Sequence, residues 1–532
     1  MSFASSQKTP ASPLSVDGTR GGRKGSISVT VTLLFLVFTV LGMGMLLLSQ
    51  VHLKAGVSRK NSALLDYAAE NGIKRALEDI DGVLASRATL VEVPPDRMPE
   101  LRSDALSGGT KIVEELFDWP LPRLLRETWE DMSWESVTAC GPERTEDRED
   151  FLSISYRFRI DSKGKLVNFK PERASQCDAS LYVLAGRLPL PCVPFLLNKK
   201  MDAGTENDFL SSKGISFRTA PGGGPAASLE VVKTPVIPTD ATPLLDKALR
   251  LRLFRPEDLD AAAVRRAVGL EPSNDPVPDG VYLIQDDLGL GGVFVQGDIE
   301  ELVTAIDGPF QVICFRSEAG EWVLRFSPSL RQTFFATPDA SRSYDLVPEG
   351  IIAVNGKIGA LGGGTMDASG RVVLAEEEAV PSILAGVILT ILSSEGVTIS
   401  THLISQGVRW QDGVPYVKDD SSQVIIYSTG KDFLEGTTEK GGISIAEGAP
   451  ANLTIQASLI AGGTGFAVQG EGKDIEVLGG IQAVDYTSEG NTLRISPDRG
   501  LAEGRSLPGN APLSTVPMLY ISSFRVREWK EY

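Results

Sequence analysis

The feature that most constrains this chain is an uncharged stretch near its start. After Lys24 no charged residue occurs until Lys54, and residues 29–48 are mostly apolar. At a helical rise of about 1.5 Å per residue, this run spans the roughly 30 Å hydrocarbon core of a bilayer. It exceeds the roughly 7–15 apolar residues of a signal-peptide core, and no A-x-A cleavage site follows it. The sequence therefore predicts a membrane span.

The charges before this span predict its orientation. Residues 1–25 form a basic leader in which Arg20, Arg23 and Lys24 stand directly before the apolar run. By the positive-inside rule, the leader stays in the cytoplasm and the remainder of the chain is exported.

The helical pattern continues beyond the span, so residues 26–90 are expected to form one helix whose second part is amphipathic. Polar residues, among them Asp66, Glu70 and Lys74, occupy the side opposite an apolar face. The three-and-four spacing of that face predicts packing on a folded domain. Its members are Leu65, Ala68, Ala69, Ala76, Leu77, Ile80 and Leu84.

The basic leader ends in Gly and is followed by a small residue, a long apolar span and then "ALLDYAAENGIKRAL". This arrangement resembles the start of type IV pilin-like proteins, specifically the PilX-type minor pilins. The resemblance covers about residues 20–80. It implies cleavage by a prepilin peptidase between Gly25 and Ser26 and contact with other pilin-like subunits. It also implies a single-pass protein of the bacterial inner membrane with a periplasmic or extracellular C-terminal part. Its expected role is pilus assembly, adhesion or surface display.

One position departs from the pattern of major pilins. These generally carry Glu at the fifth mature position, where a carboxylate can pair with a neighbour's terminal ammonium in lipid. Counted from Ser26, that position is Thr30. Because an unpaired charge is costly in the membrane, the sequence favours a minor component over the bulk fibre subunit.

The next region, residues 91–240, is expected to be a mixed α/β unit. Pro120 and Pro122 interrupt a helical pattern that starts near Lys111. "FLSISYRFRID" alternates like a half-buried strand, and Lys163–Gly164 after it suggest a hairpin turn. Residues 241–345 are expected to hold a linker and the start of a β-rich region.

The β-rich character is most evident in residues 346–532. A local unit recurs with apolar residues at positions one, three and seven, which places the first two on one face of a strand. This pattern favours a β-solenoid-like domain. Because the spacing between units is unequal, whereas regular solenoids have a fixed period, the coil would be irregular, and a β-sandwich remains the alternative. The fold class is thus α+β, mainly β. The five units are Val293, Val295, Ile299; Ile352, Val354, Ile358; Val397, Ile399, Leu403; Leu453, Ile455, Leu459; and Ile475, Val477, Ile481. The polar residues within these units are expected to be exposed, namely Gln296, Asn355, Gln456 and Glu476.

The last part of the chain also resembles a known type of domain. Phrases such as "GIIAVNGKI", "ANLTIQASLIAGGTGFAVQ" and the closing "FRVREWKEY" are similar to a β-rich domain of unknown function found behind pilin-like N-termini in bacterial envelope proteins. The resemblance covers about residues 345–532 and implies no activity.

The sequence gives little support for catalysis, so the chain is expected not to be an enzyme and to bind no cofactor. It lacks G-x-S-x-G, Walker and H-E-x-x-H motifs. Its two histidines, His52 and His402, are expected to be solvated or satisfied. The glycines of "LGLGGVFVQGD" and "LIAGGTGFAVQGEG" are expected at corners between strands. No Cys pair has metal-site spacing, and a disulfide among Cys140, Cys177 and Cys192 is possible in an oxidising compartment.

Two other functions remain open. The first is an envelope-anchored β-helical carbohydrate-active enzyme that would use carboxylates such as Asp286, Asp287, Asp298 and Glu376–Glu378. The second is a static adhesin or scaffold unconnected to pili. The net charge of −17 disfavours nucleic acid as a partner and predicts repulsion from anionic lipid.

Overall fold

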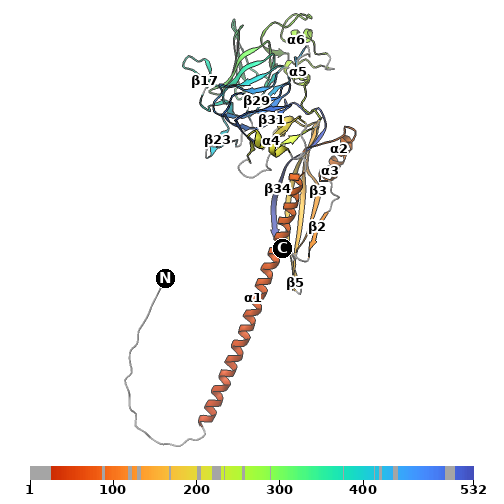
Figure 1. Ribbon diagram of the computed structural model, residues 1–532, viewed down its shortest axis with the longest axis vertical. Helices are drawn as coiled ribbons and strands as arrows, with labels where there is room; N and C mark the ends of the chain where they lie inside the picture. Colours follow the sequence, from red (N-terminus) through yellow and green to blue (C-terminus); the bar gives the residue numbers. More distant parts are fainter. Residues whose placement is uncertain are drawn as a thin grey trace, which may run out of the picture.

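The computed structural model describes most of the chain after residue 25. The described ranges are 26–86, 90–117, 123–128, 133–166, 169–199, 205–218, 229–232, 234–253, 258–287, 289–375, 377–411, 414–417, 422–434, 441–497 and 510–531. Strand residues (45%) outweigh helical residues (23%), which confirms the expectation of a mainly β protein behind a long apolar helix. Figure 1 shows the helix α1 (Ser26–Ser86) projecting far below the folded part of the molecule.

The lower folded part, which we call the body, is an antiparallel sheet packed on the second half of α1. The two outer strands have three and six residues, and the four inner ones have 14 to 18. Two short helices, α2 (Met98–Leu106) and α3 (Lys111–Phe117), lie beside them. The order across the sheet is β1 (Leu90–Glu92), β34 (Met518–Glu531), β5 (Phe169–Gly186), β4 (Phe151–Leu166), β3 (Ser133–Asp147) and β2 (Arg123–Thr128).

The position of β34 defines the architecture. This last strand pairs antiparallel with β5 along its length and with β1 at its start. Residues 187–517, which we call the head, are therefore inserted between two neighbouring strands of the body sheet. In Figure 1 the C-terminus lies beside α1, and the head lies above it, at the top of the picture.

The head contains three long ladders in which most neighbouring strands run parallel. The first orders β8 (Glu230–Val231), β6 (Phe195–Leu197), β31 (Gly480–Ala483), β28 (Ser458–Ala461), β25 (Gln423–Ser428), β20 (Ile388–Ser393), β16 (Ile351–Asn355), β10 (Gly289–Gln296) and the antiparallel β9 (Gly280–Asp286). The second runs through β11 (Ile299–Asp307), β17 (Ile358–Met366), β21 (Val397–Ile399), β26 (Ile443–Ile445), β29 (Phe466–Val468) and β32 (Tyr486–Thr487). The third joins β27 (Asn452–Ile455), β30 (Asp474–Leu478), β33 (Thr492–Ser496) and β7 (Ile215–Phe217).

Smaller elements decorate these ladders. An antiparallel extension of the second ladder contains β12 (Phe310–Ser317), β13 (Gly320–Ser327), β14 (Gln332–Ala336) and β15 (Ser341–Tyr344), and β18 (Val372–Leu374) pairs with β17. Two-stranded pairs are β19 (Pro381–Ile383) with β22 (Ile404–Ser405), and β23 (Val408–Gln411) with β24 (Val414–Val417). The helical pieces are η1 (Leu190–Cys192), α4 (Glu206–Ser212), α5 (Thr242–Leu249) and α6 (Ala261–Ala267).

The pattern of apolar residues predicts the head core well. All fifteen members of the five recurring units are buried, each at most 1% exposed, and all belong to one core cluster. The pairing also crosses residue 346, because β10 pairs in parallel with β16. Residues 518–531 lie in the body sheet rather than in the ladders.

The polar residues within these units were expected to be exposed, and this prediction is wrong. Asn355, Gln456 and Glu476 are only 5–6% exposed, and Gln296 is half-buried. Each of the three buried side chains has a partner on a neighbouring segment. Asn355 accepts a hydrogen bond from Phe433 N (3.1 Å), Gln456 from Ser405 N (2.8 Å) and Glu476 from Ser496 Oγ (2.9 Å). These contacts compensate the loss of water, so polar side chains can be buried here.

Two local expectations also differ from the structure. β4 continues through Lys163–Gly164 to Leu166, which pairs with Phe169, so Lys163–Gly164 lie within a strand and not at a turn. Gly291 and Gly292 lie within β10 rather than at a corner. A Cβ on either residue would come within 2.6 Å of a backbone carbonyl oxygen, on Ala248 and Ile351 respectively, so these glycines permit α5 and β16 to approach closely.

Candidate functional site

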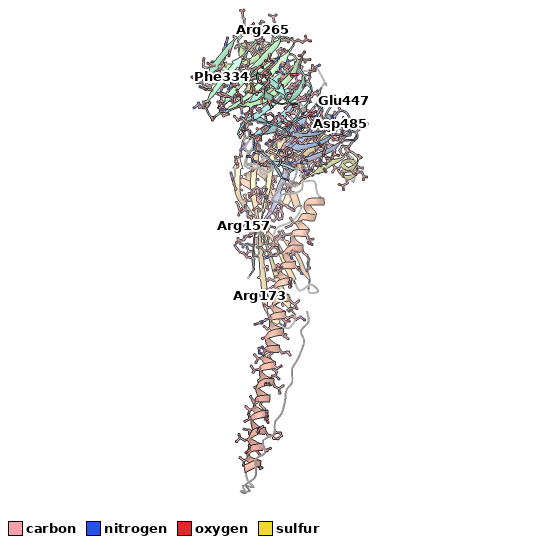
Figure 2. All side chains as sticks on the ribbon, turned by 90° about the vertical axis from the view of Figure 1, so that its left-hand side faces the viewer. Arg157, Arg173, Arg265, Phe334, Glu447 and Asp485 are labelled. Carbon is pink, nitrogen blue, oxygen red and sulfur yellow. The ribbon has the colours of Figure 1, made fainter. Side chains whose placement is uncertain are left out.

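The first half of α1 is a candidate membrane span. Between Ser28 and Ile80 the helix is long enough and apolar enough to cross a membrane. Its most apolar 18-residue window has a mean hydropathy of 2.6, and none of the residues in that window is buried. Large side chains such as Phe35 and Met45 are 71% exposed. Figure 2 shows side chains radiating from the part of α1 below the body. Such a surface needs an apolar surrounding.

The hydroxyl groups on this segment are compatible with that surrounding. Thr32 Oγ1 donates to Ser28 O (2.8 Å) and Thr39 Oγ1 to Phe35 O (2.7 Å). Bonding to the carbonyl one turn earlier satisfies a hydroxyl without water. Ser26 is the first residue of α1 and Thr30 is exposed one turn later, whereas Gly25 lies outside the described residues.

The second half of α1 packs on the body sheet. From the predicted face, Leu65, Ala69 and Ile80 are at most 1% exposed. Ile73 is absent from the predicted face, yet it is 0% exposed and belongs to the same core cluster as Tyr156 and Phe158 of β4. Its spacing of four residues from Ala69 is a signal that could have identified it.

Gly164 sets the distance between the helix and the sheet. A Cβ at this position would lie 2.3 Å from the carbonyl oxygen of Leu65 and 3.1 Å from Ala69 N. Both are backbone atoms of α1, so any larger residue would push the helix away. Beside this contact, Arg173 of β5 reaches Ser62 Oγ (3.3 Å) and Asp66 Oδ1 (3.4 Å).

The two chain crossings between body and head bind to each other. Leu188 N donates to Ser514 Oγ (2.8 Å), Ser514 N donates to Leu188 O (2.7 Å), and Leu190 N donates to Pro512 O (3.0 Å). One apolar cluster continues from Tyr520 of the body sheet to Tyr427 of the first ladder. We call this paired segment the neck, and it joins the head to the body sheet on which α1 packs.

All four cysteines are free thiols in the structure. Cys140 on β3 and Cys177 on β5 flank β4, opposite Arg157 and Ile160 respectively. Two strand spacings amount to about 9.6 Å, more than the roughly 7 Å between Cα atoms that a disulfide tolerates. Burial raises the pKa of Cys177 to about 11, which keeps this thiol protonated. Cys192 lies in η1, in a different apolar cluster.

His402 is satisfied, as expected. It is 4% exposed, and its Nδ1 accepts a hydrogen bond from Thr454 N (3.1 Å). Burial lowers the pKa of His402, and a hydrogen bond with the Glu377 backbone raises it by less. The ring is therefore neutral near pH 7 and both nitrogens are engaged. His52 is exposed on α1.

Two of the carboxylates singled out in the sequence are engaged with separate basic groups. Asp286 pairs with Arg250, and Asp298 lies 3.7 Å from Lys357 Nζ. Glu376 lies outside the described residues. Within the described ranges, no group of three or more His, Cys, Asp or Glu is arranged to hold a metal ion.

A cavity of about 210 Å³ lies between the start of α5 and the segment after β25. It is smaller than the roughly 300–1,000 Å³ of most ligand pockets. Asp240, on its wall, accepts hydrogen bonds from Thr242 N (2.9 Å) and Thr242 Oγ1 (2.5 Å), so the carboxylate is engaged by the first residue of α5.

Comparison with family models, with curated proteins and with solved structures found no significant match.

Proposed function

We propose that this protein is a type IV pilin-like minor component of a bacterial inner membrane, cleaved by a prepilin peptidase after Gly25. One observation carries the proposal: a single helix is bare and apolar in its first half and packs by its second half on an antiparallel sheet. The bare half anchors the protein or packs with other pilin-like helices, and the head is displayed outside the membrane. The proposal includes no catalytic role.

N-terminal sequencing of envelope-purified protein tests the processing step. We expect the mature chain to start at Ser26. Gly25→Leu should leave the leader attached, whereas the matched leader variant Gly22→Leu should still be cleaved. A chain that keeps residue 1 would show a plain membrane anchor and contradict the proposal.

Thr30 leads to a second expectation about abundance. Without a carboxylate at this position, the helix lacks the charge partner that a neighbour's terminal ammonium requires in lipid. Quantitative mass spectrometry of sheared surface fibres should find this chain at much lower copy number than any companion pilin with Glu at mature position five. Finding it as the dominant fibre protein would contradict the minor role.

We further propose that the head is a β-solenoid. Successive strands enter the three ladders in turn, as in β25, β26, β27 followed by β28, β29, β30. Thr398 lies opposite Ser444, and Ser444 opposite Ala467, in parallel register. Neighbouring positions about 4.8 Å apart can form a disulfide, while positions two strands apart cannot.

A crosslinking experiment distinguishes this solenoid from a sandwich. The pair Thr398→Cys with Ser444→Cys should crosslink under mild oxidation, because the two Oγ atoms are 3.2 Å apart. The control pair Thr398→Cys with Ala467→Cys should not. Equal crosslinking of both pairs, or of neither, would contradict the proposed coil.

A further inference from the structure

Charge is distributed unevenly along the molecule. The chain carries a net charge of −17, yet residues 49–65 contain Lys54, Arg59 and Lys60 and no acidic residue. All three basic side chains are exposed on α1, between the apolar segment and the first buried residue, Leu65. The membrane-proximal end is therefore basic although the whole protein is acidic.

The hairpin between β4 and β5 brings further basic residues to the same end. Lys163 and Lys165 are exposed near the end of β4. Gly164, between them, contacts α1 at Leu65. β4 extends two residues further to Leu166, about 6.6 Å at 3.3 Å per residue, which corresponds to about four residues of helix. The end of the hairpin thus lies near the level of Arg59 and Lys60.

Acidic residues at this end do not cancel the charge. Asp66 lies 3.4 Å from Arg173, and Glu172 lies 3.9 Å from Lys165. The two acidic residues offset only two of the six basic charges at this end, which are the three on α1 and those of Lys163, Lys165 and Arg173. Figure 2 places Arg173 at the lower end of the body, where the bare helix begins. We call Lys54, Arg59, Lys60, Lys163 and Lys165 the basic collar.

The length of the uncharged segment places the collar at a membrane surface. Residues 26–53 contain no charge. These 28 residues form about 42 Å of helix, which matches the roughly 40–45 Å of a bilayer with its headgroups. Lys54 then lies at the outer edge of the headgroups, and Arg59 and Lys60 lie about 7.5–9 Å beyond it. That distance is comparable with the Debye length of about 8 Å at physiological ionic strength.

We propose that the basic collar docks on anionic phospholipid headgroups of the leaflet opposite the leader. This inference rests on the membrane placement in the proposed function, but not on processing or on pilus assembly. Attraction between juxtamembrane basic residues and anionic lipid holds the lower end of the body at the bilayer. The neck transmits this orientation to the head, whose acidic surface is repelled from the same lipid.

Lipid selection by the full chain tests the collar. The protein is extracted from vesicles of equal phosphatidylglycerol and phosphatidylcholine, and co-purified lipid is counted by native mass spectrometry. The variant Lys54→Gln/Arg59→Gln/Lys60→Gln should lower the ratio of bound phosphatidylglycerol to phosphatidylcholine at least about 5-fold at low salt. Lys163→Gln/Lys165→Gln should lower it about 2-fold.

The matched control removes three exposed charges from the head, Arg266→Gln/Arg342→Gln/Lys431→Gln, and should leave the ratio unchanged. Because no variant changes the basic leader, the difference between collar and control variants isolates the collar whether or not the leader has been cleaved. Equal ratios in these two variants would overturn the proposal. Displacement of phosphatidylglycerol by inorganic phosphate, but not by chloride of equal ionic strength, would show a site for free phosphate and would also overturn it.

Discussion

The body and the head pack their strands in different ways. In the body, three strands of 15, 16 and 18 residues lie across one helix and form an antiparallel sheet. In the head, the parallel ladders contain strands of two to nine residues, and their core repeats from Phe195 to Ile495. The body core lies between the sheet, α1 and the short helices α2 and α3, and α1 approaches the sheet most closely at Gly164, whereas the head core is distributed over many similar contacts.

This difference predicts where the molecule is most sensitive to substitution. Opening the contact of α1 with the sheet separates the whole helix from its partner. A similar change in an outer loop of the head leaves its ladders intact. We expect the largest losses of stability at the contact between α1 and the sheet and at the neck, and smaller losses at His402 and at the ion pair of Asp66.

The largest effect is expected for Gly164→Val. The new side chain would collide with the backbone of Leu65 and Ala69, so the helix must move off the sheet. We expect a loss of about 3 kcal/mol in the free energy of unfolding of the full chain in mild detergent. Cleavage by trypsin at Arg173 should also become faster.

The matched control for this change is Gly448→Val. Gly448 is exposed in the head, and a Cβ there would meet no atom within 4 Å. Its free energy of unfolding should change by less than about 0.5 kcal/mol. Equal losses at both positions would refute the idea that the body depends on one close contact.

A smaller effect is expected at the neck. Ser514 Oγ accepts from Leu188 N and donates to Val516 O (2.8 Å), and Ser514 is 0% exposed. Ser514→Ala leaves a buried N–H without this acceptor and should cost about 1–3 kcal/mol. Calorimetry should show one unfolding transition in the original chain and two in the variant. Ser341→Ala, on an exposed strand, is the control, and an unshifted single transition in Ser514→Ala would show that the neck does not couple the two regions.

The same contrast explains what the sequence could predict. The helix face and the five apolar units were predictable because local periodicity determines which side chains are buried. Burial of Asn355, Gln456 and Glu476 was not, because it depends on hydrogen bonds from segments 20 to 78 residues away. The return of β34 to the body and the approach of Gly164 to Leu65 likewise depend on long-range pairing that leaves no local pattern. Gly25 and Thr30 were selected by resemblance, which the fold does not test.

Stability of the head should depend moderately on pH through His402. Burial lowers the pKa of this ring in the folded state, while the unfolded chain has the ordinary value of 6.5. As pH falls below 6.5, the unfolded chain binds more protons, so the folded state loses stability by at most about 1.4 kcal/mol per pH unit. His402→Gln should weaken this loss between pH 7 and 5 in urea unfolding. His52→Gln, on the exposed helix, should retain it, and identical pH profiles for all three proteins would exclude this role of His402.

The smallest effect is expected for the ion pair between Asp66 and Arg173, which lies in the same helical turn as the contact of Gly164. Both side chains are 47% exposed, so water and salt screen their attraction. Asp66→Asn should therefore change the free energy of unfolding by less than about 0.5 kcal/mol, and 0.5 M salt should reduce even that change. Arg173→Gln should have a similar effect, and the double variant should cost no more than about the larger single change. If Asp66→Asn instead cost more than about 1 kcal/mol, the helix would be held to the sheet by charge pairing as well as by its apolar face, and the body would have a second centre of stability beside the Gly164 contact.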